Sequence, residues 1–390
     1  MSPAKFPRAL LPIVLVGCCW AQSNPQPRIV DLKASDGTLL KASYFAAAKP
    51  GPGVLLLHQC NQQRKLWDPL AVALNSAGIN VLTVDYRGFG ESGGARFEKL
   101  APEEANKITN EVWPGDIDIA YQYLLAQPGV QHDKIGAGGA SCGVNNSILL
   151  ARRHPEVKVL MLLSGPTDRN GRLFLQSSGL PVFTAAADDD VFGNLTLIMQ
   201  WLFSVSPNPA SRFQRYSTGG HGAEMFAPHP ELADLIAHWY LAALNNGTVP
   251  PTNGSPLSAA QMHTLELIDQ PDGADRVAKT LADAREHDPK ANLFSEFIVN
   301  WLGYEHLTLG DRKGAVEILK LNAAAYPESP NVYDSLADAY LADGQKDLAL
   351  VNAKKALELL ANDSTDDPQR RKAVQESAEK KLRELGAEPH

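Results

Sequence analysis

The chain has 390 residues, of which 44% are hydrophobic and 21% are charged, so it is not intrinsically disordered and can form a full core. At about 150 residues per domain, this length predicts two to three domains. The 44 acidic residues outnumber the 36 lysines and arginines, and the resulting net charge of −8 argues against nucleic acid or an anionic membrane surface as a partner.

The first 21 residues have the pattern of a signal peptide. Lys5 and Arg8 form a basic start, and the apolar stretch from Ala9 to Val16 is too short to cross a bilayer, which takes about 20 residues. Two endings stay open, because an ordinary cleavage site at Ala21 and a lipobox that would be acylated at Cys18 both fit. We therefore expect an exported protein, periplasmic or secreted, with no transmembrane span and with membrane anchoring only through a lipidated Cys18.

Residues 28–245 alternate short apolar runs with helical patterns. The expected strands are 28–33, 38–45, 54–58, 79–84, 134–138, 157–163 and 181–186, and the expected helices are 66–77, 117–126, 147–154, 191–204 and 231–244. Buried runs separated by helices predict an α/β fold, a doubly wound and mostly parallel sheet with helices on both faces. Ligands of such sheets bind beyond the carboxyl ends of the strands, so polar residues that follow a strand are the candidates.

The strongest chemical motif is a G-x-S-x-G sequence around Ser141, between a predicted strand and a predicted helix. A serine at this sharp turn projects its hydroxyl above the sheet, where the N-terminus of the next helix favours developing negative charge. Gly139 and Gly143 leave out side chains that would collide in the turn. We interpret Ser141 as a nucleophile; the alternative is a tight structural turn.

A nucleophilic serine needs a base and an acid that orients the base. Downstream of Ser141, the strand 181–186 runs into Asp188, Asp189 and Asp190, and a later glycine-flanked loop holds His221. The order serine, acid, histidine is the one that this layout requires. We therefore predict His221 as the base and Asp190, or else Asp189, as its acid; for His221 the alternative is an ordinary surface histidine.

Two backbone N–H groups should form the oxyanion hole. One belongs to Cys142, the residue after the nucleophile, and the other to the loop after the strand 54–58, where Cys60 is the first choice and Gln59 the second. This assignment brings Cys60 and Cys142 side by side. An oxidising compartment would allow them to pair, so a disulfide and two packed free thiols both stay open.

The segment Asp85-Tyr86-Arg87-Gly88-Phe89-Gly90-Glu91-Ser92 resembles the D-x-R-G-x-G-x-S loop of the α/β-hydrolase superfamily. The elbow serine, the acid and the histidine also follow that order, and the resemblance is closest to the esterase and dienelactone-hydrolase-like branches. It implies a Ser-His-Asp hydrolase that acts through an acyl-enzyme. Gln59 departs from the usual glycine at its position. Ser141 replaces the cysteine of dienelactone hydrolases proper, so their substrate does not carry over.

The C-terminal part has a different pattern. A Pro/Gly-rich linker at 246–260 precedes residues 261–390, in which Leu302, Gly310 and Ala315 recur 34 residues later as Leu336, Gly344 and Ala349. The expected helices are 294–309, 313–325, 332–342, 345–360 and 370–385, and residues 265–287 are expected to form a degenerate preceding repeat unit. This pattern resembles tetratricopeptide (TPR) repeats. The resemblance implies a surface for a protein or peptide partner, although a purely structural role fits as well.

Together these features predict an exported serine hydrolase that cleaves the carboxylic ester bond of a small acyl substrate. The alternatives are a serine peptidase or amidase of the same fold, and a non-catalytic hydrolase-fold protein that binds partners through its repeats. The sequence contains no metal-ligand cluster or phosphate-binding loop, so we expect no cofactor.

Overall fold

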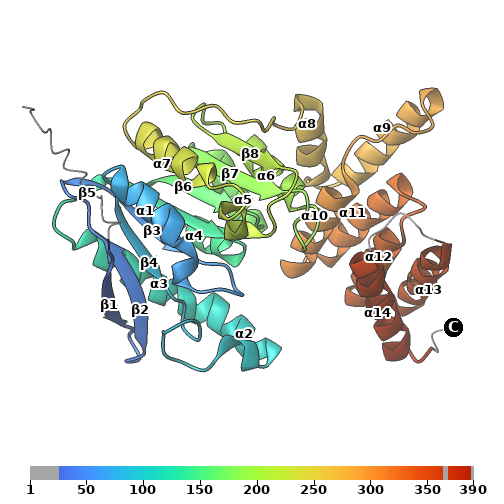
Figure 1. Ribbon diagram of the computed structural model, residues 1–390. Helices are drawn as coiled ribbons and strands as arrows, with labels where there is room; N and C mark the ends of the chain where they lie inside the picture. The colour runs from blue at the N-terminus through green and yellow to red at the C-terminus, as the bar shows by residue number, and fades with distance from the viewer. Residues whose placement is uncertain (1–25, 363–367, 388–390) are drawn as a thin grey trace, which may run out of the picture.

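The computed structural model describes residues 26–362 and 368–387. The predicted signal segment, including Cys18, lies outside the described residues. The described chain has a sheet part, coloured blue to yellow, and a helical part, coloured gold to red, which lie side by side (Figure 1). None of the helices in these two ranges is long and apolar enough to cross a membrane.

The sheet part confirms the expected α/β fold with a mostly parallel sheet. Its strands lie in the order β1-β2-β4-β3-β5-β6-β7-β8, and β2 is antiparallel to both of its neighbours while the other pairs are parallel. The strands are β1 (Arg28–Lys33), β2 (Leu39–Phe45), β3 (Gly51–Leu57), β4 (Asn80–Val84), β5 (Val130–Ala140), β6 (Val157–Leu163), β7 (Val182–Ala187) and β8 (Arg212–Tyr216).

Helices cover both faces of this sheet, as the buried runs predicted. In β3, Val54 and Leu56 join the core beneath α1 and α7, while Leu55 and Leu57 join the core beneath α3 and α4. The helices of the sheet part are α1 (Asp68–Ser76), α2 (Pro102–Lys107), α3 (Trp113–Leu125), α4 (Cys142–Arg153), α5 (Arg169–Ser178), α6 (Leu195–Val205) and α7 (Glu231–Leu244).

The sequence did not reveal β8, α2 or α5. In β8 the sequence is Arg-Phe-Gln-Arg-Tyr, and Phe213 is its one buried residue, so the strand lacks the apolar run of its neighbours. Helix α5 is largely polar; the carboxylate of Asp168 caps it by accepting a hydrogen bond from the amide of Gly171 at 2.7 Å.

The helical part contains α8 (Ala259–Ile268), α9 (Gly273–His287), α10 (Glu296–Thr308), α11 (Arg312–Ala325), α12 (Pro330–Ala342), α13 (Lys346–Asn362) and α14 (Pro368–Glu384). The stretch 265–287, expected as a degenerate repeat unit, contains the end of α8 and the whole of α9, separated by residues 269–272. The other helices begin and end within a few residues of the predicted limits. A turn at Gly310 separates α10 from α11, and a turn at Gly344 separates α12 from α13.

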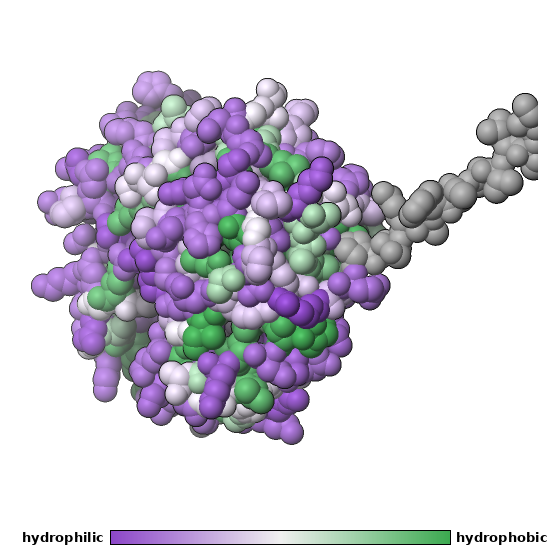
Figure 2. Space-filling view, turned by 90° about the vertical axis from the view of Figure 1, so that its left-hand side faces the viewer, coloured by the Kyte–Doolittle hydropathy of each residue, from purple (hydrophilic) through white to green (hydrophobic). Residues whose placement is uncertain are grey.

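One hydrophobic core runs through both parts of the molecule. Trp201 and Leu202 of α6 belong to the same buried cluster as Ile298 and Leu302 of α10. The polar segment between the two parts also lies against the sheet part, since the amide of Gly254 donates to the carbonyl of Phe213 at 2.8 Å. By contrast, the face of the sheet part turned away from α8–α14 is mainly hydrophilic, with hydrophobic residues in small patches (Figure 2).

Candidate active site

Ser141 lies at a strained turn between β5 and α4, with φ 54° and ψ −122°. Positive φ is costly for a residue other than glycine and is typical of a nucleophile at such an elbow. A Cβ atom on Gly139 would lie 2.0 Å from the carbonyl oxygen of Gly143, and one on Gly143 would lie 2.3 Å from the carbonyl oxygen of Leu57. These contacts confirm the physical reason for both glycines of the motif.

His221 and Asp190 are buried together beyond the carboxyl end of β7. The Nδ1 atom of His221 lies 2.9 Å and 3.0 Å from the two carboxylate oxygens of Asp190. Since a carboxylate only accepts, Nδ1 carries the proton and Nε2 keeps its lone pair. An imidazole held in this form can take a proton at Nε2, as a general base must.

The three consecutive aspartates have three different partners. Asp188 forms an exposed ion pair with Arg215 at 2.9 Å. Asp189 accepts hydrogen bonds from the amides of Gly219 and Gly220 at 2.8 and 2.9 Å, so its carboxylate holds the loop before His221 and does not contact the ring. Of the two candidates for the acid, Asp190 therefore contacts His221, whereas Asp189 binds the backbone of the loop.

The His221 loop lies against the serine elbow. A Cβ atom on Gly222 would lie 3.1 Å from the Cβ of Ala140, the residue before Ser141. The buried side chain of Gln59 accepts a hydrogen bond from the amide of Ala223 at 3.1 Å. Gln59, which replaces the usual glycine, thus ties the loop after β3 to the loop of the candidate base.

The two residues predicted to supply the oxyanion hole are joined. A disulfide connects Cys60 with Cys142, and their Cα atoms are 5.9 Å apart. Cys142 opens α4, and the first amides of a helix have no carbonyl partner within that helix. The loop after β3 is therefore fixed beside the N-terminus of α4, where a negatively charged oxygen is favoured.

His58 and Asp85 have structural roles next to the site. Burial lowers the pKa of His58 to about 4, so the ring is neutral: Nδ1 donates to the carbonyl of Gln59 at 2.7 Å, and Nε2 accepts from the amide of Tyr86 at 3.0 Å. The buried carboxylate of Asp85 accepts from the guanidinium and the amide of Arg64. These hydrogen bonds occupy both ring nitrogens of His58 and the carboxylate of Asp85, so neither side chain is free for proton transfer.

A cavity of about 550 Å³ opens beside Ser141. Thr109, from the segment between β4 and α3, lines it. Residues of the sheet part share the lining with five residues of the helical part that sequence reasoning missed. Those five are Trp301, Tyr304, Glu305, Thr308 and Leu309.

Among the described residues, no group of three or more histidine, cysteine or acidic side chains could hold a metal ion. The buried titratable groups next to the elbow are the hydrogen-bonded pair His221 and Asp190. With a serine, a base, an acid and two backbone donors, the arrangement suits acyl transfer.

Comparison with known proteins gives partial matches. A family model described as the C-terminal domain of BAAT and acyl-CoA thioester hydrolases matches residues 118–193, a segment that includes Ser141 and Asp190 but not His221. An uncharacterised protein of Mycobacterium tuberculosis is 29% identical over 139 residues, 35% of this chain and 45% of that protein. The thiohydrolase aneE of Aspergillus aculeatus is 28% identical over 113 residues, 29% of this chain and 33% of that protein.

The chain spans less than half the length of these curated relatives. Among solved structures, the esterase Pf2001 of Pyrococcus furiosus matches at 16% identity with a TM-score of 0.46, over 56% of this chain and 91% of that one. Over residues 118–193 the chain is thus similar to a domain of acyl-CoA thioester hydrolases, and over 113 residues it is similar to a thiohydrolase.

Proposed function

We propose that the protein is a serine hydrolase that cleaves the carboxylic ester bond of a small acyl substrate. The observation that carries this proposal is the buried pair of His221 and Asp190, in which Nδ1 lies 2.9 Å from a carboxylate oxygen and the loop of His221 lies against the elbow of Ser141. A lone elbow serine is compatible with a structural turn. A histidine fixed by a carboxylate in the form that accepts a proton at Nε2 adds the second and third members of a triad.

The reaction would run in two halves. Ser141 Oγ attacks the carbonyl carbon while His221 Nε2 takes the hydroxyl proton, and the amides of Cys60 and Cys142 stabilise the oxyanion. His221 then returns the proton to the leaving oxygen, which departs as the alcohol and leaves an acyl-serine. A water molecule, deprotonated by His221, attacks this ester, and the acid and free Ser141 are released.

Thioester hydrolysis is a second candidate. It is supported by the match of residues 118–193 to a domain of acyl-CoA thioester hydrolases and by the similarity to a thiohydrolase. The same groups would serve, because the first half differs only in that the leaving group is a thiol in place of an alcohol.

Two further proposals concern the setting of the enzyme. We propose that it is exported, which the disulfide between Cys60 and Cys142 supports because such bonds persist in oxidising compartments. We also propose that α10–α13 are two TPR-like units, since Gly310 and Gly344 occupy equivalent turns 34 residues apart.

Labelling with a fluorophosphonate probe tests the central proposal. We expect the folded protein to form one adduct, on Ser141, and the Ser141→Ala variant to form none and to lose at least about 1,000-fold in ester turnover. Ser164→Ala is a matched control: Ser164 also has positive φ at a strand end, and its hydroxyl has no partner among the described residues. A wild-type protein that is folded but not labelled would refute catalysis by Ser141. Nitrophenyl esters measured beside acyl thioesters would separate the two substrate classes.

A further inference from the structure

One helix of the C-terminal part forms a wall of the cavity beside Ser141. Trp301, Tyr304, Glu305 and Thr308 of α10 all line this cavity; we call these four residues the α10 face. Their spacing of three, four and seven residues places them on one side of the helix. The helical part therefore lines the cavity with a continuous helix surface that faces the candidate nucleophile.

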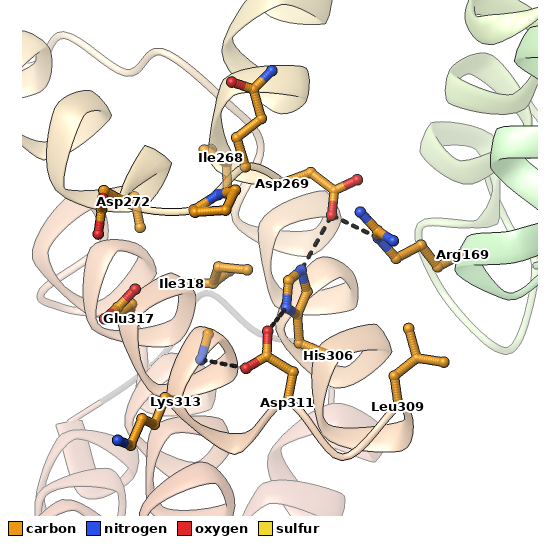
Figure 3. A pocket seen from close by; sticks show the side chains of 14 residues that line it. Arg169, Ile268, Asp269, Asp272, His306, Leu309, Asp311, Lys313, Glu317 and Ile318 are labelled. Atoms are coloured by element: carbon orange, nitrogen blue, oxygen red, sulfur yellow. Dashed lines mark hydrogen bonds and ion pairs between the residues drawn. The ribbon is translucent and has the colours of Figure 1, made fainter.

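The α10 face is held in place by buried charges. Arg172 of α5 donates to Glu305 at 2.9 Å and to Asp269 at 3.1 Å, and its guanidinium lies 4.6 Å from the centre of the Trp201 ring. Figure 3 shows Arg169 of the sheet part reaching Asp269, which also contacts His306 of α10. We call Arg169, Arg172, Asp269, Glu305 and His306 the interface cluster.

Apolar packing holds the same helix. Ile298 and Leu302 are almost fully buried in the core that contains Trp201 of the sheet part. With charged contacts on one side and this core on the other, α10 is fixed with respect to Ser141. A fixed wall can select substrates by shape, because the helix does not move to accommodate a group that does not fit.

The charges around the cavity limit what it can accept. Asp168 brings a carboxylate to the lining, whereas Glu305 is paired with Arg172 and the guanidinium of Arg169 is paired with Asp269. An anionic acyl group would meet unfavourable charge there, whereas Trp301 and Tyr304 offer aromatic surface. These contacts favour an uncharged aromatic or branched acyl group.

We propose that the α10 face is the acyl-binding wall of the enzyme and sets the size of its substrate, a neutral ester with a bulky acyl group. This inference rests on the proposed function of Ser141. It makes the appended helical part a component of the active site, in addition to any partner that it binds elsewhere.

The test compares p-nitrophenyl acetate with p-nitrophenyl 3-phenylpropanoate in the full-length protein. We expect Trp301→Ala to lower kcat/KM for the bulky ester about 10- to 100-fold and that for acetate less than about threefold, since acetate is too small to reach the wall. Trp301→Phe should restore most of the activity on the bulky ester. The readout is the ratio of the two kcat/KM values, which a general loss of folded protein does not change.

Phe297→Ala is the matched control for Trp301→Ala. Phe297 lies one turn earlier on α10 and packs against the same core, but it does not line the cavity. We expect its replacement to leave the ratio unchanged. If Phe297→Ala shifts the ratio as far as Trp301→Ala does, helix docking and not the wall determines the preference, and the proposal is wrong.

A second variant works by filling the cavity. Thr308 is exposed at the end of α10, so Thr308→Trp is compatible with folding. This variant should lower kcat/KM for the bulky ester at least tenfold while acetate turnover continues. Thr280→Trp is its control, because Thr280 is an exposed helical threonine on α9, away from the cavity lining, and its hydroxyl also bonds the carbonyl four residues earlier.

The outcomes separate the two proposals. If the wild-type protein labels at Ser141 but neither Trp301→Ala nor Thr308→Trp changes the ratio, the acyl-wall inference fails and the hydrolase proposal stands. If the folded wild-type protein neither labels nor turns over either ester, the hydrolase proposal fails and takes this inference with it.

Discussion

Asp188, Asp189 and Asp190 show how neighbouring residues of one type acquire different tasks. Asp188 pairs with Arg215 at the surface, Asp189 binds two loop amides, and Asp190 binds His221. The order of the candidate triad residues and the glycines around Ser141 could be predicted from the sequence, because they follow from the chain path through an elbow. Which carboxylate meets the ring could not, since that depends on side-chain directions within one turn.

This division of tasks predicts the effects of single substitutions. We expect Asp190→Asn to lower kcat for ester hydrolysis about 100- to 10,000-fold, because an amide no longer fixes His221 with its proton on Nδ1. Asp189→Asn, which keeps an oxygen acceptor for the loop amides, should cost less than about tenfold. Asp188→Asn is the control and should stay within about twofold, as exposed ion pairs contribute little. Steady-state kinetics on one ester decides; equal losses in Asp189→Asn and Asp190→Asn would contradict the assignment.

At the scale of elements, the loop after β3 and the start of α4 behave as one unit because of the disulfide. The bond joins residues separated by 82 positions, so the double variant Cys60→Ser/Cys142→Ser should lose about 2–5 kcal/mol in the free energy of unfolding. Ester turnover should fall as well, since the two oxyanion amides lose their fixed spacing. Urea denaturation with and without reductant measures the first effect.

The double variant also serves as the control for that experiment, because reductant should lower the stability of the wild-type protein and leave the variant unchanged. A thiol titration of the unfolded, unreduced protein that lacks the first 21 residues should find no free thiol. Two titratable thiols would contradict the disulfide and remove one support for export.

Two features could not be predicted from the sequence, for a related reason. Strand β8 has one buried residue, and the residues of the α10 face, on a helix that was expected, contact a cavity formed with another part of the chain. Apolar periodicity reports which face of an element is buried, but not which partner covers it. The helices of the C-terminal part could therefore be predicted nearly to their ends, while their position over Ser141 could not.

In the whole molecule, the two parts meet through the shared core and the interface cluster. The ring of His306 contacts Asp269 at 3.1 Å and Asp311, at the start of α11, at 2.7 Å. The hydrogen bond to Asp269 raises the pKa of His306 above its usual value near 6.5. Burial opposes ionisation of Asp269, yet the hydrogen bonds from His306 and Arg169 hold the pKa of that carboxyl well below its usual range.

These opposite shifts predict a pH window for the joined molecule. A raised histidine pKa contributes stability that is complete below the unfolded value near 6.5 and is lost as the pH rises through the folded value. A lowered aspartate pKa contributes stability above the unfolded value near 3.9 that is lost on acidification. We therefore expect the interface to be strongest between about pH 4 and 6.5, and the thermal unfolding midpoint to fall as the pH rises from 6 to 9.

His306→Gln should flatten this fall, whereas His238→Gln should preserve it, because His238 is an exposed histidine of α7 whose ring contacts a backbone carbonyl. Scanning calorimetry of the full chain at several pH values makes the comparison. Since the interface cluster holds the α10 face beside Ser141, the preference for bulky over small acyl esters should weaken over the same pH range in the wild-type protein. A preference that stays constant while the unfolding midpoint falls would separate stability from selectivity and place the selection elsewhere in the cavity.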